Sequence, residues 1–98
     1  MSYQIKYTHA SKIDYEKLDN SQKLQVRKSL KKLENFGFSA GQPLKGKLSD
    51  CKKLKHRKLG LRVIFKQSDL GIEIIEIVVI GKRDAKEVYK EAEKRLGR

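Results

Sequence analysis

The sequence predicts an α+β domain in which helices pack against a small, largely antiparallel sheet, with the element order β-α-α-β-β-β-α. Three observations lead to this fold class. Polar and apolar residues alternate near the N-terminus, two helical segments follow in succession, and a β-branched run over 72–80 precedes a last helical segment. Ninety-eight residues are too few for two separate cores, so we expect a single domain over residues 1–98.

The N-terminal third of the chain predicts one strand and a pair of helices. Residues 3–8 alternate between apolar and polar side chains, which is typical of a half-buried strand. A short helix is expected next, and Asp19 is a possible cap for a longer one that Gly37 can end. The longer helix places these apolar residues on one face: Val26, Leu30 and Leu33. We expect this helical hairpin to lie on the sheet, with the lysines of its second helix in water.

The middle of the chain predicts a loop followed by three strands. Residues 38–50 contain two glycines and the only proline, so we interpret them as a loop. Alternating side chains predict strands over 51–57 and 61–66. The run over 72–80 is rich in isoleucine and valine, which is typical of a strand buried on both faces at the centre of a sheet.

The C-terminal segment predicts a final helix. Asp84 is followed three residues later by Glu87, which is a variant of the capping box that begins helices. Helical spacing relates the apolar residues of the segment: Ala85, Val88, Tyr89, Ala92 and Leu96. This face is expected to pack against the sheet.

The chain is strongly basic, and its positive charge is concentrated in the middle. Lysine and arginine number 24 against 12 acidic residues, which gives a net charge of +12. Residues 41–67 hold nine of the basic residues and one acidic residue. Such an excess in one short segment favours a polyanion as partner, and nucleic acid is the leading candidate.

Several other classes of protein are disfavoured. No apolar run approaches the ~20 residues that span a bilayer, and the first residues lack the pattern of a signal peptide. We therefore expect a cytoplasmic protein with no membrane partner. Cys51 is the only cysteine, which excludes an internal disulfide and leaves a cysteine-based metal site without its ligands. We expect no metal and no cofactor.

Five motifs between Pro43 and Leu96 carry a resemblance to a known family. They are LKG at 44–46, DCKKLK at 50–55, GLRVIF at 60–65, VIGKR at 79–83 and EVYKEAEKRL at 87–96. In their order and spacing the chain resembles the RelE family of bacterial toxins, which are ribosome-dependent messenger RNA endonucleases of toxin–antitoxin pairs. Residues before Pro43 agree with the family mainly in pattern, as a strand followed by a helical hairpin.

The resemblance implies an activity carried by cations and a tyrosine. The matching catalytic candidates are Lys53, Lys55, Arg62, Arg83 and Tyr89. Other cations of the basic middle segment are candidates for RNA binding: Lys45, Lys47, Lys52 and Arg57. Relatives commonly carry an aromatic residue at the position of Lys52 and a tyrosine at that of Leu61, and neither difference removes a functional group. The resemblance also implies two partners, a cognate antitoxin and the 70S ribosome with messenger RNA in its A site.

These residue types suit cleavage of RNA by its own 2′-hydroxyl, which requires neither a protein nucleophile nor a metal. Such cleavage needs a base, a group that stabilises charge on the phosphate, and assistance to the leaving oxygen. Crowded cations disfavour the charged form of a lysine, so Lys53 or Lys55 is the candidate base. Arg62 is expected to bind the phosphate oxygens, Arg83 to hold the phosphate or assist the leaving oxygen, and Tyr89 to stack on or orient the nucleotide.

Alternatives to this interpretation remain open. A ParE-like toxin shares the fold but acts on DNA gyrase without cutting RNA, and a decayed relative would bind RNA or antitoxin without catalysis. The complete set of basic residues counts against both. At single positions, Tyr89 could be a core residue, and Arg62 could pair with Glu73 or Glu76 across the sheet. We interpret His9 and His56 as structural, because neither has an identifiable catalytic partner.

Overall fold

A five-stranded mixed sheet forms the centre of the computed structural model, which describes residues 3–56, 58, 60–82 and 85–98. The strands are arranged in the order β1-β5-β4-β3-β2. Their bounds are β1 (Gln4–Tyr7), β2 (Gln42–Pro43), β3 (Cys51–His56), β4 (Leu61–Ser68) and β5 (Gly71–Gly81). β1 pairs with β5 in parallel, and the other neighbouring pairs are antiparallel. The predicted α+β class and largely antiparallel sheet are therefore confirmed.

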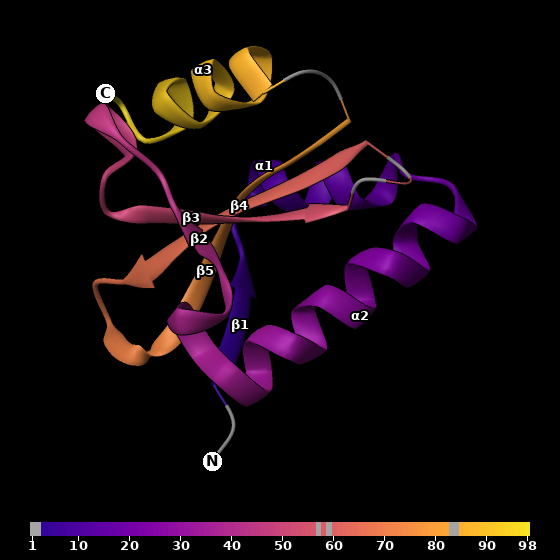
Figure 1. Cartoon of the computed structure of the whole chain (residues 1–98), viewed down its shortest axis with the longest axis horizontal. Helices are drawn as coiled ribbons and strands as arrows, with labels where there is room; N and C mark the ends of the chain where they lie inside the picture. The colour runs from indigo at the N-terminus through magenta and orange to yellow at the C-terminus, as the bar shows by residue number, and fades with distance from the viewer. Residues whose placement is uncertain (1–2, 57, 59, 83–84) are drawn as a thin grey trace.

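Helices cover the sheet on both faces. They are α1 (His9–Glu16), α2 (Asn20–Phe36) and α3 (Ala85–Arg95), with short 3₁₀ helices η1 (Gly37–Ala40) and η2 (Gly46–Leu48). Figure 1 shows α2 and α3 on opposite sides of the sheet, with α1 behind it. The predicted order of helices and strands is confirmed except for β2, an additional two-residue strand. No helix within the described ranges is both long and apolar enough to cross a bilayer.

Local sequence signals define both ends of α2. The Asp19 carboxylate accepts a hydrogen bond from the Gln22 backbone N–H at 2.8 Å, and the Gln22 side chain accepts one from the Asp19 N–H at 3.0 Å. This reciprocal pair satisfies two N–H groups at the start of the helix. Gly37 ends α2 with a φ of 68°, and a Cβ there would lie 2.3 Å from the Tyr3 ring. Only glycine fits at this helix end.

Two apolar clusters lie on opposite faces of the sheet. The larger cluster lies under α2 and includes Val26, Leu30, Leu33, Leu61, Val63 and Phe65. The smaller cluster lies under α3 and includes Cys51, Ile64, Val78, Val79, Val88 and Ala92. The alternation of β4 explains this division, because its odd-numbered residues from Leu61 to Phe65 face α2 while Ile64 faces α3.

A β-bulge in β5 lies where backbone groups of this strand bond to side chains of α1 and α3. Val79 lies opposite Ile64 and Ile77 lies opposite Phe65, so Val78 is the extra residue of β5. The Val78 carbonyl accepts a hydrogen bond from the Arg95 guanidinium at 2.9 Å, and the Ile80 N–H donates to the Asp14 carboxylate at 3.1 Å.

Arg95 also donates to Asp14 at 2.6 and 3.0 Å, which joins α1, β5 and α3 at one point. The pairing of β1 with β5 ends at Ile77. Beyond that point, Asp14 and Arg95 bond the backbone groups of Ile80 and Val78. We call this pair the edge clamp.

The structure differs from the sequence prediction in two places. The predicted loop over 38–50 contains part of η1, the two-residue strand β2, and η2. These elements are too short to show a period, and Pro43 argues against a strand except at a sheet edge, which is where β2 lies. In addition, the middle strand of the sheet is β4 and not β5, although β5 is interior. The predicted helix cap at Asp84 lies outside the described residues.

Candidate functional site

Three of the predicted catalytic cations lie together on the face of the sheet that α3 covers. Lys55 of β3 is directly opposite Arg62 of β4, and Lys53 is opposite Ile64 in the same register. Since Ile64 belongs to the cluster under α3, Lys53, Lys55 and Arg62 all belong to that face. We call these three residues the cation strip. Lys53 and Arg62 are half-buried, and Lys55 is exposed.

The cation strip places like charges where they repel. Side chains directly opposite each other on antiparallel strands have Cβ atoms about 4.5 to 5.5 Å apart, and like charges at such positions destabilise a sheet. Lys55 and Arg62 form such a pair, while the register places Glu76 opposite Lys66 and Gly81 opposite Arg62. The register therefore places Gly81 directly opposite Arg62, and neither Glu73 nor Glu76. A phosphate between the two strands carries charge opposite to both side chains, so the strip is suited to binding one.

Tyr89 connects the cation strip to α3. The Lys53 ammonium donates a hydrogen bond to the Tyr89 hydroxyl at 2.9 Å, and its nitrogen lies 5.7 Å from the centre of the Tyr89 ring. The ring is half-buried and packs on the cluster formed by Val88, Ala92 and their neighbours. Tyr89 thus has the core contacts expected from its helical spacing, and its hydroxyl also belongs to the site.

The end of β5 allows α3 to approach the strip closely. Gly81 lies opposite Arg62, and a Cβ on Gly81 would lie 2.5 Å from a Val88 methyl carbon. A larger residue at 81 would push the start of α3 away from the sheet. Arg83, the fourth predicted catalytic cation, and Arg57, a predicted RNA-binding residue, both lie outside the described residues.

Lys45 and Lys47 lie in a segment that the last residue of the chain holds in place. Both side chains are exposed, Lys47 within η2 and Lys45 directly before it. Arg98 donates to the Lys47 carbonyl at 2.9 Å and to the Asp50 carboxylate at 2.6 Å. The Arg98 guanidinium lowers the pKa of Asp50 to about 2. These contacts fix the segment beside the C-terminal end of α3.

Lys52 is the predicted RNA-binding residue that the fold separates from the strip. Its ammonium lies 4.5 Å from the centre of the Phe38 ring, and its position in β3 is opposite Phe65 of the larger cluster. Because successive residues of a strand face opposite sides, Lys52 belongs to the face that α2 covers. The structure therefore does not bring Lys52 together with Lys53 and Lys55.

The remaining polar candidates occupy structural positions. The His56 ring is in hydrogen-bond contact with the Ser29 hydroxyl of α2, and burial lowers the pKa of this histidine. His9 is exposed at the start of α1. Burial raises the pKa of Cys51 to about 11, so its thiol remains protonated at neutral pH. Among the residues that the structure describes, no three His, Cys, Asp or Glu side chains are grouped to hold a metal ion.

Comparison with known proteins identifies the family. No family model matches the sequence. The chain is 33% identical over 96 residues to a protein of Escherichia coli named as a RelE-like toxin, covering 98% of this chain and 99% of the relative. The chain belongs to the RelE toxin family. It is also 28% identical, with the same coverage, to the mRNA interferase toxin RelE of E. coli strain K12.

Solved RelE structures share the fold of this RelE-family toxin. A doubly substituted E. coli toxin RelE in the free state superposes with a TM-score of 0.79 at 29% identity, covering 98% of this chain and 99% of the other. The same toxin variant in complex with an antitoxin RelBc peptide gives a TM-score of 0.70 at 30% identity, covering 94% and 95% of the two chains. The matches are to RelE toxins, and the ParE-like alternative is not favoured.

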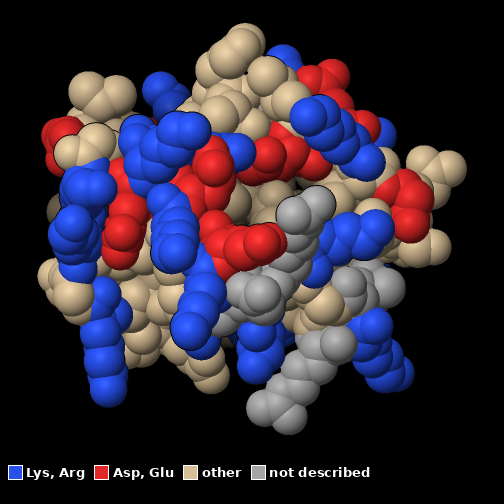
Figure 2. All heavy atoms as spheres, turned by 90° about the horizontal axis from the view of Figure 1, so that it is seen from above, with Lys and Arg blue, Asp and Glu red and all other residues tan. Residues whose placement is uncertain are grey.

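A groove on the other side of α3 was not foreseen in this RelE-family toxin. It has a volume of about 500 Å³ and lies between α1, the end of β5 and α3. Its lining includes Asp14, Leu18, Ile80, Glu87, Glu91 and Arg95. Figure 2 shows acidic side chains gathered in the middle of the face that carries α3, with basic side chains around them. The edge clamp forms part of this groove, and its residues are 81 positions apart, so no local sequence pattern reveals the pair.

Proposed function

We propose that this RelE-family toxin is an mRNA interferase, a ribosome-dependent endoribonuclease that cuts messenger RNA in the ribosomal A site and so inhibits translation. The observation that carries the proposal is the cation strip, in which Lys55 faces Arg62 while Lys53 donates to Tyr89 on the same side of the sheet. The name of the E. coli K12 relative, mRNA interferase toxin RelE, supports the same activity.

The proposed reaction uses the 2′-hydroxyl of the RNA as nucleophile and no metal. The 2′-oxygen loses its proton and attacks the adjacent phosphorus, the bond from phosphorus to the 5′-oxygen breaks, and that oxygen takes up a proton. Lys53 or Lys55 is the proposed base, and the other lysine binds the phosphate. Arg62 stabilises the charge that develops on the phosphate oxygens, because its planar guanidinium can donate two parallel hydrogen bonds.

Tyr89 and Arg83 complete the proposed site. The hydrogen bond from Lys53 to Tyr89 holds the ammonium group over the face of the strip, while the Tyr89 ring offers an edge on which the nucleotide is oriented. Arg83 is proposed to hold the phosphate or to assist the leaving oxygen. Lys45, Lys47, Lys52 and Arg57 are proposed to bind RNA outside the reacting phosphate.

The ribosome has a physical role in this proposal. In-line attack needs the 2′-oxygen, the phosphorus and the 5′-oxygen nearly aligned, and free RNA rarely adopts that geometry. If the A site holds the messenger in this geometry, the ribosome supplies orientation and the toxin supplies charge stabilisation and proton transfer. We further propose that the protein acts in the cytoplasm as a single domain over residues 1–98 and is restrained by a cognate antitoxin, as the RelE complex with an antitoxin peptide suggests.

Primer extension on a defined messenger, with and without programmed 70S ribosomes, tests the proposed function. We expect cuts at the A-site codon only when ribosomes are present, and we expect Arg62→Ala to slow cleavage at least ~100-fold because charge stabilisation is lost. Lys66→Ala is the matched control, since Lys66 is a cation of the same strand at its other end. Folded protein that never cuts, or cutting that persists in Arg62→Ala, would contradict the proposal.

A further inference from the structure

The solvent face of α2 carries a cluster of lysines that the fold does not use. Lys28, Lys31 and Lys32 are exposed and are related by three or four positions along the helix, so their side chains are neighbours. Within the described part of the chain, none of the three takes part in an ion pair. Like charges at this spacing destabilise a helix. Glu34, the one acidic residue of α2, lies three positions after Lys31, so positive charge exceeds negative charge on this face of the helix.

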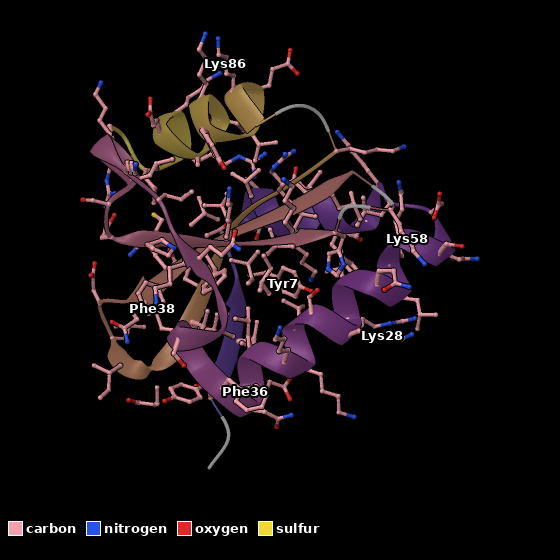
Figure 3. The ribbon with its side chains drawn as sticks, in the orientation of Figure 1. Tyr7, Lys28, Phe36, Phe38, Lys58 and Lys86 are labelled. Atoms are coloured by element: carbon pink, nitrogen blue, oxygen red, sulfur yellow. The ribbon has the colours of Figure 1, made fainter. Side chains whose placement is uncertain are left out.

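Exposed apolar residues extend the same row of the helix. Leu24, Lys28, Lys32 and Phe36 follow one another at intervals of four, which places them along one ridge of α2. Phe36 is 62% exposed and Leu24 is 46% exposed, so neither side chain contributes much to the core. Figure 3 shows Lys28 and Phe36 on the side of α2 that is turned away from the sheet. An aromatic ring beside adjacent lysines is a combination that serves single-stranded nucleic acid, because bases stack on the ring while ammonium groups bind phosphates.

The rest of the structure holds this helix face in a fixed relation to the cation strip. His56 contacts Ser29, so the end of β3 is joined to the middle of α2 at the residue that follows Lys28. Lys58 follows in the turn between β3 and β4 and is exposed toward the N-terminal half of α2 (Figure 3). Lys55 lies on the other face of the same strand end. RNA bound at α2 therefore lies on the opposite face of the sheet from the cation strip. It must be a different segment of RNA from the one bound at the strip.

We propose that Lys28, Lys31, Lys32 and Phe36 of α2 form a second RNA-binding surface, which binds a folded RNA through its phosphates and one unpaired base. The proposal rests on the proposed function for the class of ligand, RNA. It adds a surface distinct from the cation strip, on the opposite face of the sheet. Anionic lipid is a poorer match, because the two apolar side chains are separated by the lysines and do not form a continuous apolar face.

The two outer helices provide a matched pair of variants. Lys86, Lys90 and Lys94 of α3 are also exposed and are spaced by four, but Glu87, Glu91 and Glu93 lie among them. Figure 3 shows Lys86 pointing away from the sheet. Lys28→Gln/Lys31→Gln/Lys32→Gln and Lys86→Gln/Lys90→Gln/Lys94→Gln each remove three charges from exposed positions. Any effect of net charge alone is the same in both.

Binding of a stem-loop RNA of roughly 16 base pairs, measured by fluorescence anisotropy between about 50 and about 200 mM salt without ribosomes, tests the proposal. We expect the slope of log affinity against log salt to fall by about 2 to 3 in the α2 triple variant, since each phosphate contact contributes about 0.7 to 0.9. The α3 triple variant should retain the slope of the unaltered protein. Equal slopes in the two variants, whether both lowered or both unchanged, would overturn the proposal.

Phe36→Ala tests the aromatic part of the surface separately. We expect it to weaken binding of the stem-loop by roughly fivefold to a hundredfold and to leave the salt slope unchanged, because stacking involves no counterion. A fully paired duplex without a loop should bind Phe36→Ala and the unaltered protein equally. Loss of affinity for the duplex, or none for the stem-loop, would contradict the stacking role. Unfolding in urea verifies that each variant is folded.

Two further measurements separate this inference from its competitors. Binding of anionic vesicles and of poly-glutamate is measured with both triple variants. If the α2 triple variant loses affinity for either of these but not for RNA, the surface is assigned to lipid or protein instead. Cleavage on ribosomes is measured in parallel. If the α2 effect on RNA binding is present while no protein cuts, the proposed function fails and the RNA surface stands. If cleavage needs Arg62 but the two triple variants bind RNA alike, only the α2 surface fails.

Discussion

Tyr89 makes two kinds of contact through two parts of one side chain. Its ring packs on the cluster beneath α3, whereas its hydroxyl accepts the hydrogen bond from Lys53. The helical spacing of α3 predicts the first role, and only the resemblance to RelE toxins indicates the second. A substitution by phenylalanine separates the two roles, because it retains the ring and removes the hydroxyl.

Tyr89→Phe should therefore slow cleavage without unfolding the protein. The Tyr89 hydroxyl orients the Lys53 ammonium, so we expect a cleavage rate at least ~10-fold lower. Because Lys53 is only half-buried and water can replace the lost bond, the free energy of unfolding should fall by no more than about 1.5 kcal/mol. Single-turnover cleavage on programmed ribosomes and urea unfolding provide the two measurements. Tyr15→Phe on α1 is the matched control. Undiminished cleavage by Tyr89→Phe would exclude a role for the hydroxyl.

His56 is predicted to make the stability of the protein sensitive to acid. Burial lowers its pKa below the ordinary value of 6.5, so the unfolded chain binds its proton more readily than the folded chain. The free energy of unfolding should then fall as pH drops through the ordinary value. We expect His56→Gln to flatten this dependence between about pH 7.5 and about pH 5.5, as measured by urea unfolding. His9→Gln is the control, and an equal slope in both variants would contradict the assignment.

At the scale of elements, long periodic segments were predictable and short ones were not. The apolar spacing of α2 and its Asp19 cap predict that helix from local sequence, and the alternation of β4 correctly divides its side chains between the two clusters. By contrast, β2 has two residues and depends on pairing with β3, so it has no signal of its own. The β-bulge at Val78 is equally hidden, because an uninterrupted apolar run does not show which residue is extra.

The edge clamp is expected to stabilise α3 against the sheet. Asp14 and Arg95 are partly buried, with side chains 18% and 20% exposed, and each also bonds the backbone of β5. Asp14→Asn should lower the free energy of unfolding by about 1 to 3 kcal/mol and speed amide hydrogen exchange in α3. Glu91→Gln is the control, since the more exposed Glu91 pairs with Arg95 within one helix and should change stability by less than about 0.5 kcal/mol. Comparable effects of the two variants would argue against the clamp.

At the scale of the whole molecule, the sheet separates two basic surfaces of different character. The cation strip lies beneath the edge of α3, where Lys55 and Arg62 face each other across two strands, while the lysines of α2 project into solvent from the opposite side. The sequence reveals the excess of positive charge and places Lys53 and Lys55 on one face of a strand, but it does not show that Arg62 of the next strand lies opposite Lys55. It does not reveal the second surface, because lysines on the outer face of a helix also occur where they bind nothing. The like-charge spacing gains meaning only once the structure shows these lysines exposed on one side of α2, a helix in which Glu34 is the one acidic residue.

The single parallel pair of the sheet has a consequence for how the chain acquires its activity. Gln4 of β1 pairs with Ile74 of β5, 70 positions further along, so the first strand made is among the last to find its neighbour. During synthesis β1 has no strand to pair with until β5 has been made, and the smaller apolar cluster is incomplete until α3 has been made. Gly81, which lies opposite Arg62, and Tyr89, whose hydroxyl accepts a hydrogen bond from Lys53, both come from this late part of the chain. The cation strip and Tyr89 can therefore come together only after most of the chain has been made.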